Sequence, residues 1–375
     1  MSNLPHQLPN LNSIRFFAAT AVIIAHVELV KNSYNLINIQ NSLGFLGDWG
    51  VNFFFSLSGF LITYLLILEK NKNKSIQIKH FYFRRIFRIW PLYYWILALS
   101  ILLSFILINK SPLIADFNLK ALVYNILLLP QIAKSYIHQS FSSAVLWSIG
   151  VEELFYLFFP LLFISLKSKP IFKLSIGIAI LLLAKICIMP LCYKLLGAEA
   201  SKAPINLISM TRFEIMLTGS LFAFWASQNI TYINSKLMCF WIGLAGLFFL
   251  SSISFLPKLY APENAWAPVL VSVLIPFFLS VFMSVILSYL AFSSKLKFAL
   301  SNRFLDFGGK ISYGLYVYHP LVLILISYLF PTLLKSSVPG FFLLITLLIT
   351  ILISALSYEY FEKPFLKVSI KYRHL

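Results

Sequence analysis

Two ionisable side chains within one apolar stretch of the sequence have the types and the spacing for catalysis. Arg15 and His26 both fall in the stretch 11–30, which has the length of a membrane-spanning helix. They are eleven residues apart, so at about 100° per residue they share one helix face, about 16 Å apart along its axis. Ionisable groups in a span usually face a bundle interior or a water-filled cavity, so we expect both to look into one cavity. The alternative is that Arg15 snorkels to the headgroups and His26 is a packing residue.

Asp48 and Asn52 begin the second apolar stretch, at a depth comparable to that of His26. An Asp or Asn beside the imidazole would fix its tautomer, as an orienting group does in acyl-transfer sites. The same stretch carries Gly50 and Gly59, which permit close helix approach. The alternative for Asp48 and Asn52 is a loop carboxylate and an interhelical hydrogen bond.

An arginine cluster precedes the third apolar stretch, in the segment FYFRRIFRIWPLYYW. Arg85 and Arg88 are three residues apart at the start of a helix and share a face, with Arg84 beside them. Guanidinium groups suit phosphate oxygens, so a cytoplasmic phosphate-bearing cosubstrate would fit, and a nucleotide such as coenzyme A is the obvious candidate. The competing interpretation is a topology determinant that touches only lipid phosphates.

Two further apolar stretches contain charged residues. Glu152 and Glu153 are adjacent and cannot both face lipid cheaply, so at least one should be in the polar interior, paired or protonated. Tyr156 follows Glu152 by one turn on the same face. Arg212 and Glu214 lie in a later stretch, and an ion pair between Arg212 and Glu152 or Glu153 is the simplest way for a bundle to tolerate both charges.

His319 lies near the middle of another apolar stretch, among tyrosines. Pro320 follows at once and would free backbone carbonyl groups nearby.

The elements that position these groups are helices. The chain has 375 residues, of which 60% are hydrophobic and 11% charged, and the apolar residues form long blocks, as in a polytopic helical membrane protein. The net charge is +18, and the basic residues lie mainly in short loops between the apolar blocks. They therefore indicate the orientation of the chain in the membrane and no nucleic-acid partner. Cys187, Cys192 and Cys239 lack ligand-like spacing, so we expect no metal site and no disulfide framework.

Ten apolar blocks have spanning length: 11–30, 49–68, 90–108, 147–166, 174–195, 207–226, 237–256, 268–292, 310–330 and 341–361. The apolar segment 121–132 is shorter and is expected to be a re-entrant or short helix. A basic connector over 70–88 places that side, and both termini, in the cytoplasm. The predicted fold class is all-α, a polytopic transmembrane helical bundle of about ten spans plus one re-entrant or short helix.

No Gly/Ser-rich linker or second-domain composition interrupts this pattern. We therefore expect one membrane domain over residues 1–375, with 363–375 as a short basic cytoplasmic tail and no appended soluble domain. The sequence does not predict an oligomeric state.

In order and spacing, these motifs resemble acyltransferase family 3, the integral membrane O-acyltransferases of the carbohydrate O-acetylase type. The likeness rests on Arg15 with ten residues before His26. It also rests on GVNFFFSLSGFLI, RRIFRIWP, LWSIGVEELFYLFFP, RFEIMLTGSLFA, ISYGLYVYHP and YEYFEKPF, and it runs from Leu8 to Phe365. One departure is Asn52, which stands where many members have aspartate. That places a carboxylate-assisted histidine in doubt unless Asp48 substitutes.

The resemblance implies transfer of an acyl group, commonly acetyl, from cytoplasmic acyl-CoA to a hydroxyl of an extracytoplasmic or lipid-linked carbohydrate. His26 is then the expected general base, and Arg15, Arg85 and Arg88 bind the donor. The residues expected in the acceptor cavity or its supporting wall are Asp48, Asn52, Glu152, Glu153, Tyr156, Arg212, Glu214 and His319. No bound cofactor is expected. The implied partners are acyl-CoA, a carbohydrate acceptor and the lipid bilayer of a bacterial inner membrane.

Two other functions fit parts of the pattern. A transporter or flippase of a lipid-linked saccharide would also line a path with polar residues, and a catalytically idle relative could act as an assembly partner, for which Asn52 is the only hint. An inner arginine pair and an in-span histidine facing the same cavity favour acyl-CoA chemistry, because a sugar path needs neither.

Overall fold

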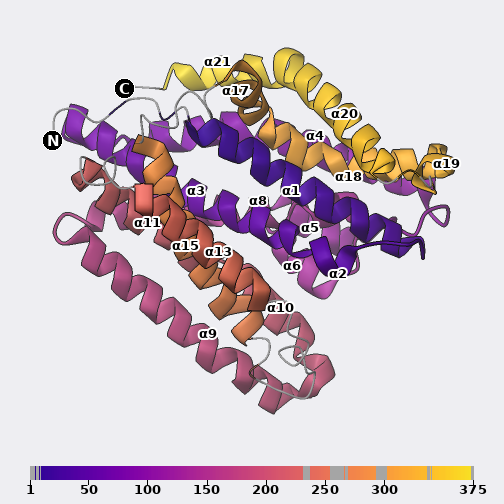
Figure 1. The fold of residues 1–375 in the computed structure, drawn as a ribbon, viewed down its shortest axis with the longest axis horizontal. Helices are drawn as coiled ribbons and strands as arrows, with labels where there is room; N and C mark the ends of the chain where they lie inside the picture. The colour runs from indigo at the N-terminus through magenta and orange to yellow at the C-terminus, as the bar shows by residue number, and fades with distance from the viewer. Residues whose placement is uncertain are drawn as a thin grey trace.

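The computed structural model describes Pro5, Leu8 and residues 10–230, 237–253, 266, 269–292, 302–335, 338 and 340–372. Within these ranges the regular structure is helical and contains no strand. Figure 1 shows α9 (Pro170–Ala200) and α20 (Phe341–Leu356) towards opposite margins of a bundle of long helices. The prediction of an all-α polytopic bundle is confirmed.

The described ranges contain nine helical stretches that are long and apolar enough to cross a membrane. Their main helices are α1 (Asn10–Ser33), α3 (Phe45–Asn73), α4 (Ile78–Leu107), α8 (Trp147–Ser165), α9, α11 (Phe213–Gln228), α15 (Ile275–Phe292), α18 (Ser312–Leu329) and α20. Some are extended by α7 (Phe141–Ala144), α10 (Lys202–Met210), the π-helical turns η2 (Leu270–Leu274) and η3 (Ser357–Glu362), and α21 (Lys363–Ile370). A shorter apolar helix, α13 (Leu237–Ile253), corresponds to the remaining expected block, 237–256. Part of that block, 254–256, lies outside the described residues.

The short apolar segment forms two helices, α5 (Leu119–Ile126) and α6 (Pro130–Tyr136). They are separated at Leu128, whose φ of 60° is left-handed and therefore ends the helical path. A helix needs about 20 residues to span a bilayer, so neither can cross alone. The prediction of a short, non-crossing element is confirmed. The remaining short helices are α2 (Gln40–Leu43), α17 (Arg303–Lys310) and α19 (Pro331–Leu334).

The basic connector is shorter than predicted, because α3 continues to Asn73 and α4 begins at Ile78. Arg84, Arg85 and Arg88 therefore lie on a helix. Glu69 ties the turn together, since its carboxylate accepts hydrogen bonds from the Gln77 backbone N–H at 2.9 Å and from Arg84 at 2.8 Å.

The expected basic tail is also partly helical. Its first residues form α21, which packs against α4, and Arg84 donates a hydrogen bond of 2.8 Å to the Tyr372 carbonyl. Residues 373–375 lie outside the described part of the chain.

Helices α3 and α11 pack with their backbones in close contact. A Cβ atom at Gly59 would overlap the Met216 carbonyl, and one at Gly219 would overlap the Ser56 carbonyl. Gly50 similarly meets the backbone of α1 at Ala18. The prediction that Gly50 and Gly59 permit close helix approach is confirmed, and these contacts fix α1 and α11 on two sides of α3.

Candidate active site

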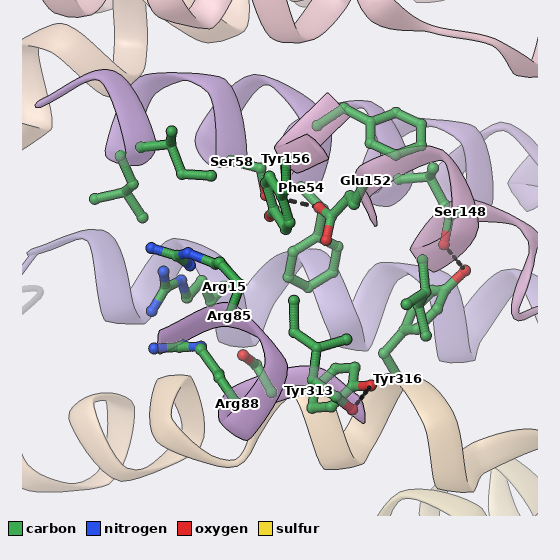
Figure 2. Close-up of a pocket in the computed structure, with 17 residues that line it drawn as sticks. Arg15, Phe54, Ser58, Arg85, Arg88, Ser148, Glu152, Tyr156, Tyr313 and Tyr316 are labelled. Atoms are coloured by element: carbon green, nitrogen blue, oxygen red, sulfur yellow. Dashed lines mark hydrogen bonds between the residues drawn. The ribbon is translucent and has the colours of Figure 1, made fainter. Parts of the chain in front are cut away.

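A cavity between α1, α3, α4, α8 and α18 collects most of the predicted donor-binding residues. It encloses about 820 Å³ of empty space, including its open mouth. Arg15 comes from α1, and Arg85 and Arg88 come from α4. Figure 2 shows the three guanidinium groups gathered at one end of the cavity. The prediction that Arg85 and Arg88 share a face is confirmed, and Arg15 joins them.

The charge at this end of the cavity is strongly positive. Among the described residues that line it, Glu152 is the sole carboxylate, against three guanidinium groups. The Arg85 guanidinium lies 5.7 Å from the Phe81 ring and 5.5 Å from the Tyr156 ring, and its buried Nε atom has no hydrogen-bond partner in the described structure. A buried donor without an acceptor is costly, so this group is ready to bind an anion.

Arg84 does not belong to this cavity. It pairs with Glu69 and with the carbonyl of Tyr372, so only two of the three clustered arginines line the cavity. Its place on the helix does not explain this, because Arg84 is four residues from Arg88; its partners Glu69 and Tyr372 hold it outside the cavity.

The two adjacent glutamates face different surroundings. Glu152 lines the cavity and accepts a hydrogen bond of 2.6 Å from the Ser58 hydroxyl (Figure 2). Tyr156 lines the same cavity, as its one-turn spacing from Glu152 predicted. Glu153 accepts a hydrogen bond of 2.7 Å from the Trp90 indole N–H and is not part of the lining.

Tyr316 and Ser148 close the far end of the cavity. The Tyr316 hydroxyl donates to the Val145 carbonyl at 3.0 Å and lies 2.8 Å from the Ser148 hydroxyl, as Figure 2 shows for the latter contact. The Phe54 ring packs 6.0 Å from the Tyr316 ring, measured between centroids. This aromatic layer ends the space that is continuous with the arginines.

His26 lies beyond this layer. It does not line the arginine cavity. The centroid of its ring lies 5.0 Å from that of His319, whose ring centroid in turn lies 5.9 Å from that of Tyr316. The prediction that Arg15 and His26 look into one cavity is therefore wrong for the described structure. Both residues lie on α1 as expected, but the Tyr316 side chain, held by two hydrogen bonds, intervenes.

The two histidines form a hydrogen-bonded pair whose direction follows from elementary chemistry. The His26 Nδ1 atom lies 2.7 Å from the His319 Nε2 atom, and the His319 Nδ1 atom lies 3.1 Å from the Leu315 carbonyl oxygen. A carbonyl can only accept, so Nδ1 of His319 carries the hydrogen, and neutral His319 must accept at Nε2. His26 therefore donates through Nδ1, which leaves the lone pair of its Nε2 atom available as a base.

Pro320 frees a backbone acceptor near the histidine pair. A proline has no backbone N–H, so the Tyr316 carbonyl, four residues earlier, loses its helical donor. This carbonyl is three residues before His319 on α18.

Asp48 and Asn52 were expected to orient His26, and this prediction is wrong. Arg212 donates to the Asn52 side-chain oxygen at 2.5 Å and to the Asp48 carboxylate at 3.2 Å. The predicted ion pair of Arg212 with Glu152 or Glu153 is also wrong. The close packing of α11 on α3 presents Arg212 to α3 instead of α8.

Glu214 has a partner that sequence reasoning missed. The Lys185 ammonium on α9 lies 2.8 and 2.9 Å from the two Glu214 carboxylate oxygens and donates to the Thr211 carbonyl at 2.7 Å. The pair is buried. The sequence did contain a signal for this pair: Lys185 lies in the middle of the apolar block 174–195, and a charge in such a block needs a partner.

Lys134 and Trp147 were also missed. The Lys134 ammonium lies 5.1 Å from the centroid of the Trp147 ring, and the Arg212 guanidinium lies 5.7 Å from it. Burial lowers the pKa of Lys134 from 10.5 to about 8; nearby Arg212 adds to this effect and Asp48 opposes it.

Within the part of the chain that the structure describes, no group of three or more His, Cys, Asp or Glu side chains could hold a metal ion.

Comparison with known proteins agrees with the motifs. The family described as "Acyltransferase domain" matches residues 8–359. Two similar curated proteins are the O-acetyltransferase OatA of Staphylococcus aureus strain NCTC 8325 / PS 47 and that of strain COL. Each is 28% identical to this chain over 98% of its length, and the match covers 58% of the relative. The chain thus spans little more than half the length of these relatives. No solved structure gives a significant match. Because the family match extends over nearly the whole chain, this protein belongs to the membrane acyltransferase family that its motifs resemble.

Proposed function

We propose that this protein transfers an acyl group, most simply acetyl, from acyl-CoA to a hydroxyl of a carbohydrate. Family membership and the O-acetyltransferase relatives support O-acyl transfer at a membrane. The choice of donor rests on a single observation. Arg15, Arg85 and Arg88 line one cavity, and Glu152 is the sole carboxylate among its described lining residues.

The charge of the arginines explains how the donor would bind. Coenzyme A carries several phosphate groups at the end remote from its thiol, and guanidinium groups bind phosphate through paired, charge-assisted hydrogen bonds. With the phosphates at the arginines, the pantetheine arm follows the cavity past Ser58 and Glu152. The thioester then arrives at Tyr316, next to the histidine pair.

The chemical step assigns His26 as the general base. Its Nε2 atom takes the proton of the acceptor hydroxyl, the hydroxyl oxygen attacks the thioester carbonyl carbon, and a C–O bond forms as the C–S bond breaks. The proton then passes from the imidazolium to the departing thiolate. A well-placed base typically contributes about 10²- to 10⁴-fold to such a rate. The step requires the Tyr316 side chain to move, because it separates the cavity from His26.

The membrane orientation follows from the basic residues. The arginine end of the bundle adjoins the lysines at the end of α3 and the start of α4, so by the positive-inside rule it faces the cytoplasm. Cytoplasmic acyl-CoA enters there, and a carbohydrate acceptor reaches His26 from the opposite side. We infer a bacterial inner-membrane protein with both termini in the cytoplasm.

A flippase is the less favoured function. A saccharide path would have to run through the bundle, whereas the described cavity ends at Tyr316 and concentrates cations at one mouth. Three guanidinium groups at one end of a cavity whose described lining contains a single carboxylate suit an anionic group that stays bound at that end.

The test compares the wild type with His26→Ala in membranes and after purification. Consumption of radiolabelled acetyl-CoA and mass spectrometry of envelope and exported glycans report donor and acceptor separately. We expect the wild type to consume acetyl-CoA and to add a 42-Da acetyl mass to a glycan, and the variant to do neither while inserting normally. A His26→Ala protein that acetylates fully would exclude this base.

A further inference from the structure

We propose that a second pocket, at the end of α4 remote from the arginines, binds a neutral, hydroxyl-rich part of the acceptor, such as an uncharged sugar unit. This α4–α5 pocket lies between the second half of α4, α5 and the segment 138–143. Ser100 on its wall is twelve residues beyond Arg88, or about 18 Å further along the helix axis. The inference rests on the proposed function, which supplies the acceptor.

The wall of the α4–α5 pocket contains buried polar atoms that have no partner. The Ser100 hydroxyl, the Asn125 side-chain oxygen and the Gln139 side-chain nitrogen are buried and make no hydrogen bond in the described structure. Ser100 is 1% exposed and Asn125 is 2% exposed. Native proteins leave few buried polar groups unpaired, because each costs about 1–3 kcal/mol. Three of them around one pocket therefore indicate a missing polar ligand.

The identities of the amide atoms are fixed by their other contacts. The Asn125 side chain donates to the Ala121 carbonyl at 2.7 Å, and a carbonyl can only accept, so the contacting atom is the nitrogen. The same nitrogen donates to the Gln139 side-chain oxygen at 2.9 Å. Asn125 thus offers a free acceptor to the pocket, and Gln139 offers a free donor.

A hydroxyl group matches this combination. It can accept from the Gln139 amide and donate to the Asn125 oxygen at once, and another hydroxyl can exchange either kind of bond with Ser100. A carboxylate or phosphate oxygen could not donate to Asn125, and an ammonium group could not accept from Gln139. Among acceptors of acyl groups, neutral sugars present several adjacent hydroxyl groups.

The size and the rim of the pocket fit the same ligand. The pocket contains about 420 Å³ of empty space, including its open mouth, which leaves room for a sugar unit. Phe117 lines the pocket with 43% of its surface exposed, between the exposed polar residues Asp116 and Asn118.

The segment after α6 connects the pocket with the reaction centre. Ser140 and Ser143 line the α4–α5 pocket, and the ring of Phe141 between them lies 5.1 Å from the His26 ring. A glycan held at the pocket can thus present a neighbouring unit to His26. The pocket would position the acceptor without touching the reacting atoms.

The experiment uses the full chain in detergent micelles, with chitotetraose and cellotetraose as neutral probes and tetragalacturonate as the charged one. Binding is measured by saturation-transfer NMR, and acetyl transfer from acetyl-CoA is measured in the same samples. We expect the wild type to bind a neutral probe. Ser100→Ala and Gln139→Leu should each weaken that binding by about 2- to 10-fold, the effect of losing one hydrogen bond.

Ser100→Ala is the sharper variant, because its hydroxyl bonds to nothing in the described structure and its loss should not harm folding. Gln131→Leu is the matched control: Gln131 is also buried, with an unpaired amide oxygen, but it does not line the pocket, so its variant should bind the glycan normally. Wild-type affinity in Ser100→Ala and Gln139→Leu would mean that the pocket holds only water. Binding of the charged probe alone, or of no probe, would also overturn the proposal.

The two proposals fail in different ways. Glycan binding that responds to Ser100→Ala, without any consumption of acetyl-CoA, would reject acyl transfer and keep the pocket. Acetyl transfer with an unchanged acceptor KM in Ser100→Ala would reject the pocket and keep the enzyme.

Discussion

The His26 Nδ1 atom lies 2.7 Å from the His319 Nε2 atom, and His319 is anchored in turn to the carbonyl oxygen of Leu315. The pair joins α1 to α18 and directs the free lone pair of His26 away from His319. In the proposed reaction His319 has the orienting role that a carboxylate has in hydrolase triads, but as a neutral acceptor. It is a positioning residue, since it acts through His26.

Replacing His319 should slow the chemical step and leave donor binding unchanged. His319→Leu removes the acceptor for the Nδ1 hydrogen of His26, so the tautomer is no longer fixed, and we expect kcat to fall by about 10- to 100-fold, part of the full effect of a general base. His319→Gln keeps an acceptor near the position of Nε2 and should recover part of the rate. Steady-state kinetics with acetyl-CoA would show both effects in kcat.

A purely structural role for His319 gives a different result. It would lower the amount of folded protein, by size-exclusion chromatography, without changing kcat per folded molecule, and glutamine would rescue no better than leucine. Nitrogen-15 spectra of histidine-labelled protein provide a second readout, because both residues should carry their hydrogen on Nδ1 in the wild type. His26 should lose that preference in His319→Leu.

Arg85 should matter for the phosphates of the donor. Removing a charge-assisted hydrogen bond costs about 1.5–3 kcal/mol, so Arg85→Ala should raise the KM for acetyl-CoA by about 10- to 100-fold with a smaller effect on kcat. Arg88 is exposed, so Arg88→Ala should have a weaker effect that fades at high salt. Initial rates over a range of acetyl-CoA concentrations measure both.

Acetyl-pantetheine, which lacks the phosphates, is the control substrate, and neither substitution should change its KM. Arg84→Ala is the control variant, because Arg84 binds Glu69 and the Tyr372 carbonyl outside the cavity. It should lower thermal stability and leave the KM for acetyl-CoA unchanged. Equal losses with both donors in Arg85→Ala would indicate a general disturbance of the cavity.

The sequence predicted the helices and the faces more reliably than the partners. Residues three, four or eleven apart on one helix, such as Arg85 with Arg88, share a face for geometric reasons, and the structure places that pair in one cavity. Partners across helices depend on rotation and depth. Arg212 binds Asn52 and Asp48 because glycine contacts draw α11 onto α3, and neither the pairing of His26 with His319 nor the closure at Tyr316 follows from spacing along one helix.

Lys134 should make stability depend on pH. Its pKa is about 8 in the folded protein and 10.5 ordinarily, so between these values the unfolded chain binds more protons and stability rises with pH. Below pH 8 the buried ammonium is charged, and its desolvation destabilises the fold. Lys134→Met removes that group. The melting temperature of the variant minus that of the wild type should therefore decrease from pH 7 to pH 10.5, measured in detergent at constant salt.

Subtracting the melting temperature of the wild type from that of Lys134→Met removes the pH dependence due to tyrosines, because these titrate in both proteins. Lys134→Arg extends the test, because a guanidinium remains charged throughout the range and should abolish the rise due to this residue. A difference between Lys134→Met and the wild type that is constant with pH would contradict the lowered pKa.

Asn52→Asp should stabilise the bundle. The side-chain oxygen of Asn52 already accepts from Arg212 at 2.5 Å, whereas its buried nitrogen has no partner in the described structure. Aspartate would remove the unpaired donor and turn the contact into a charge-assisted one, roughly twice as strong. We expect a higher melting temperature with little change in donor KM. A lower melting temperature would mean that the desolvation of the new carboxylate outweighs its pairing.

Gly59→Ala should prevent the bundle from assembling. A Cβ atom at Gly59 would overlap the Met216 backbone, which cannot move as a flexible side chain can, so α3 and α11 would have to separate. Overpacking costs about 1–3 kcal/mol, and here separation would also weaken the contact of Arg212 with Asn52. Gly177→Ala on α9 is the matched control, because its nearest contact would be a leucine methyl group at 3.9 Å, an ordinary van der Waals distance. Fluorescence-detected size-exclusion chromatography should show little monodisperse Gly59→Ala protein and near wild-type amounts of Gly177→Ala. Equal yields of the two would show that the α3–α11 contact is looser than the structure has it.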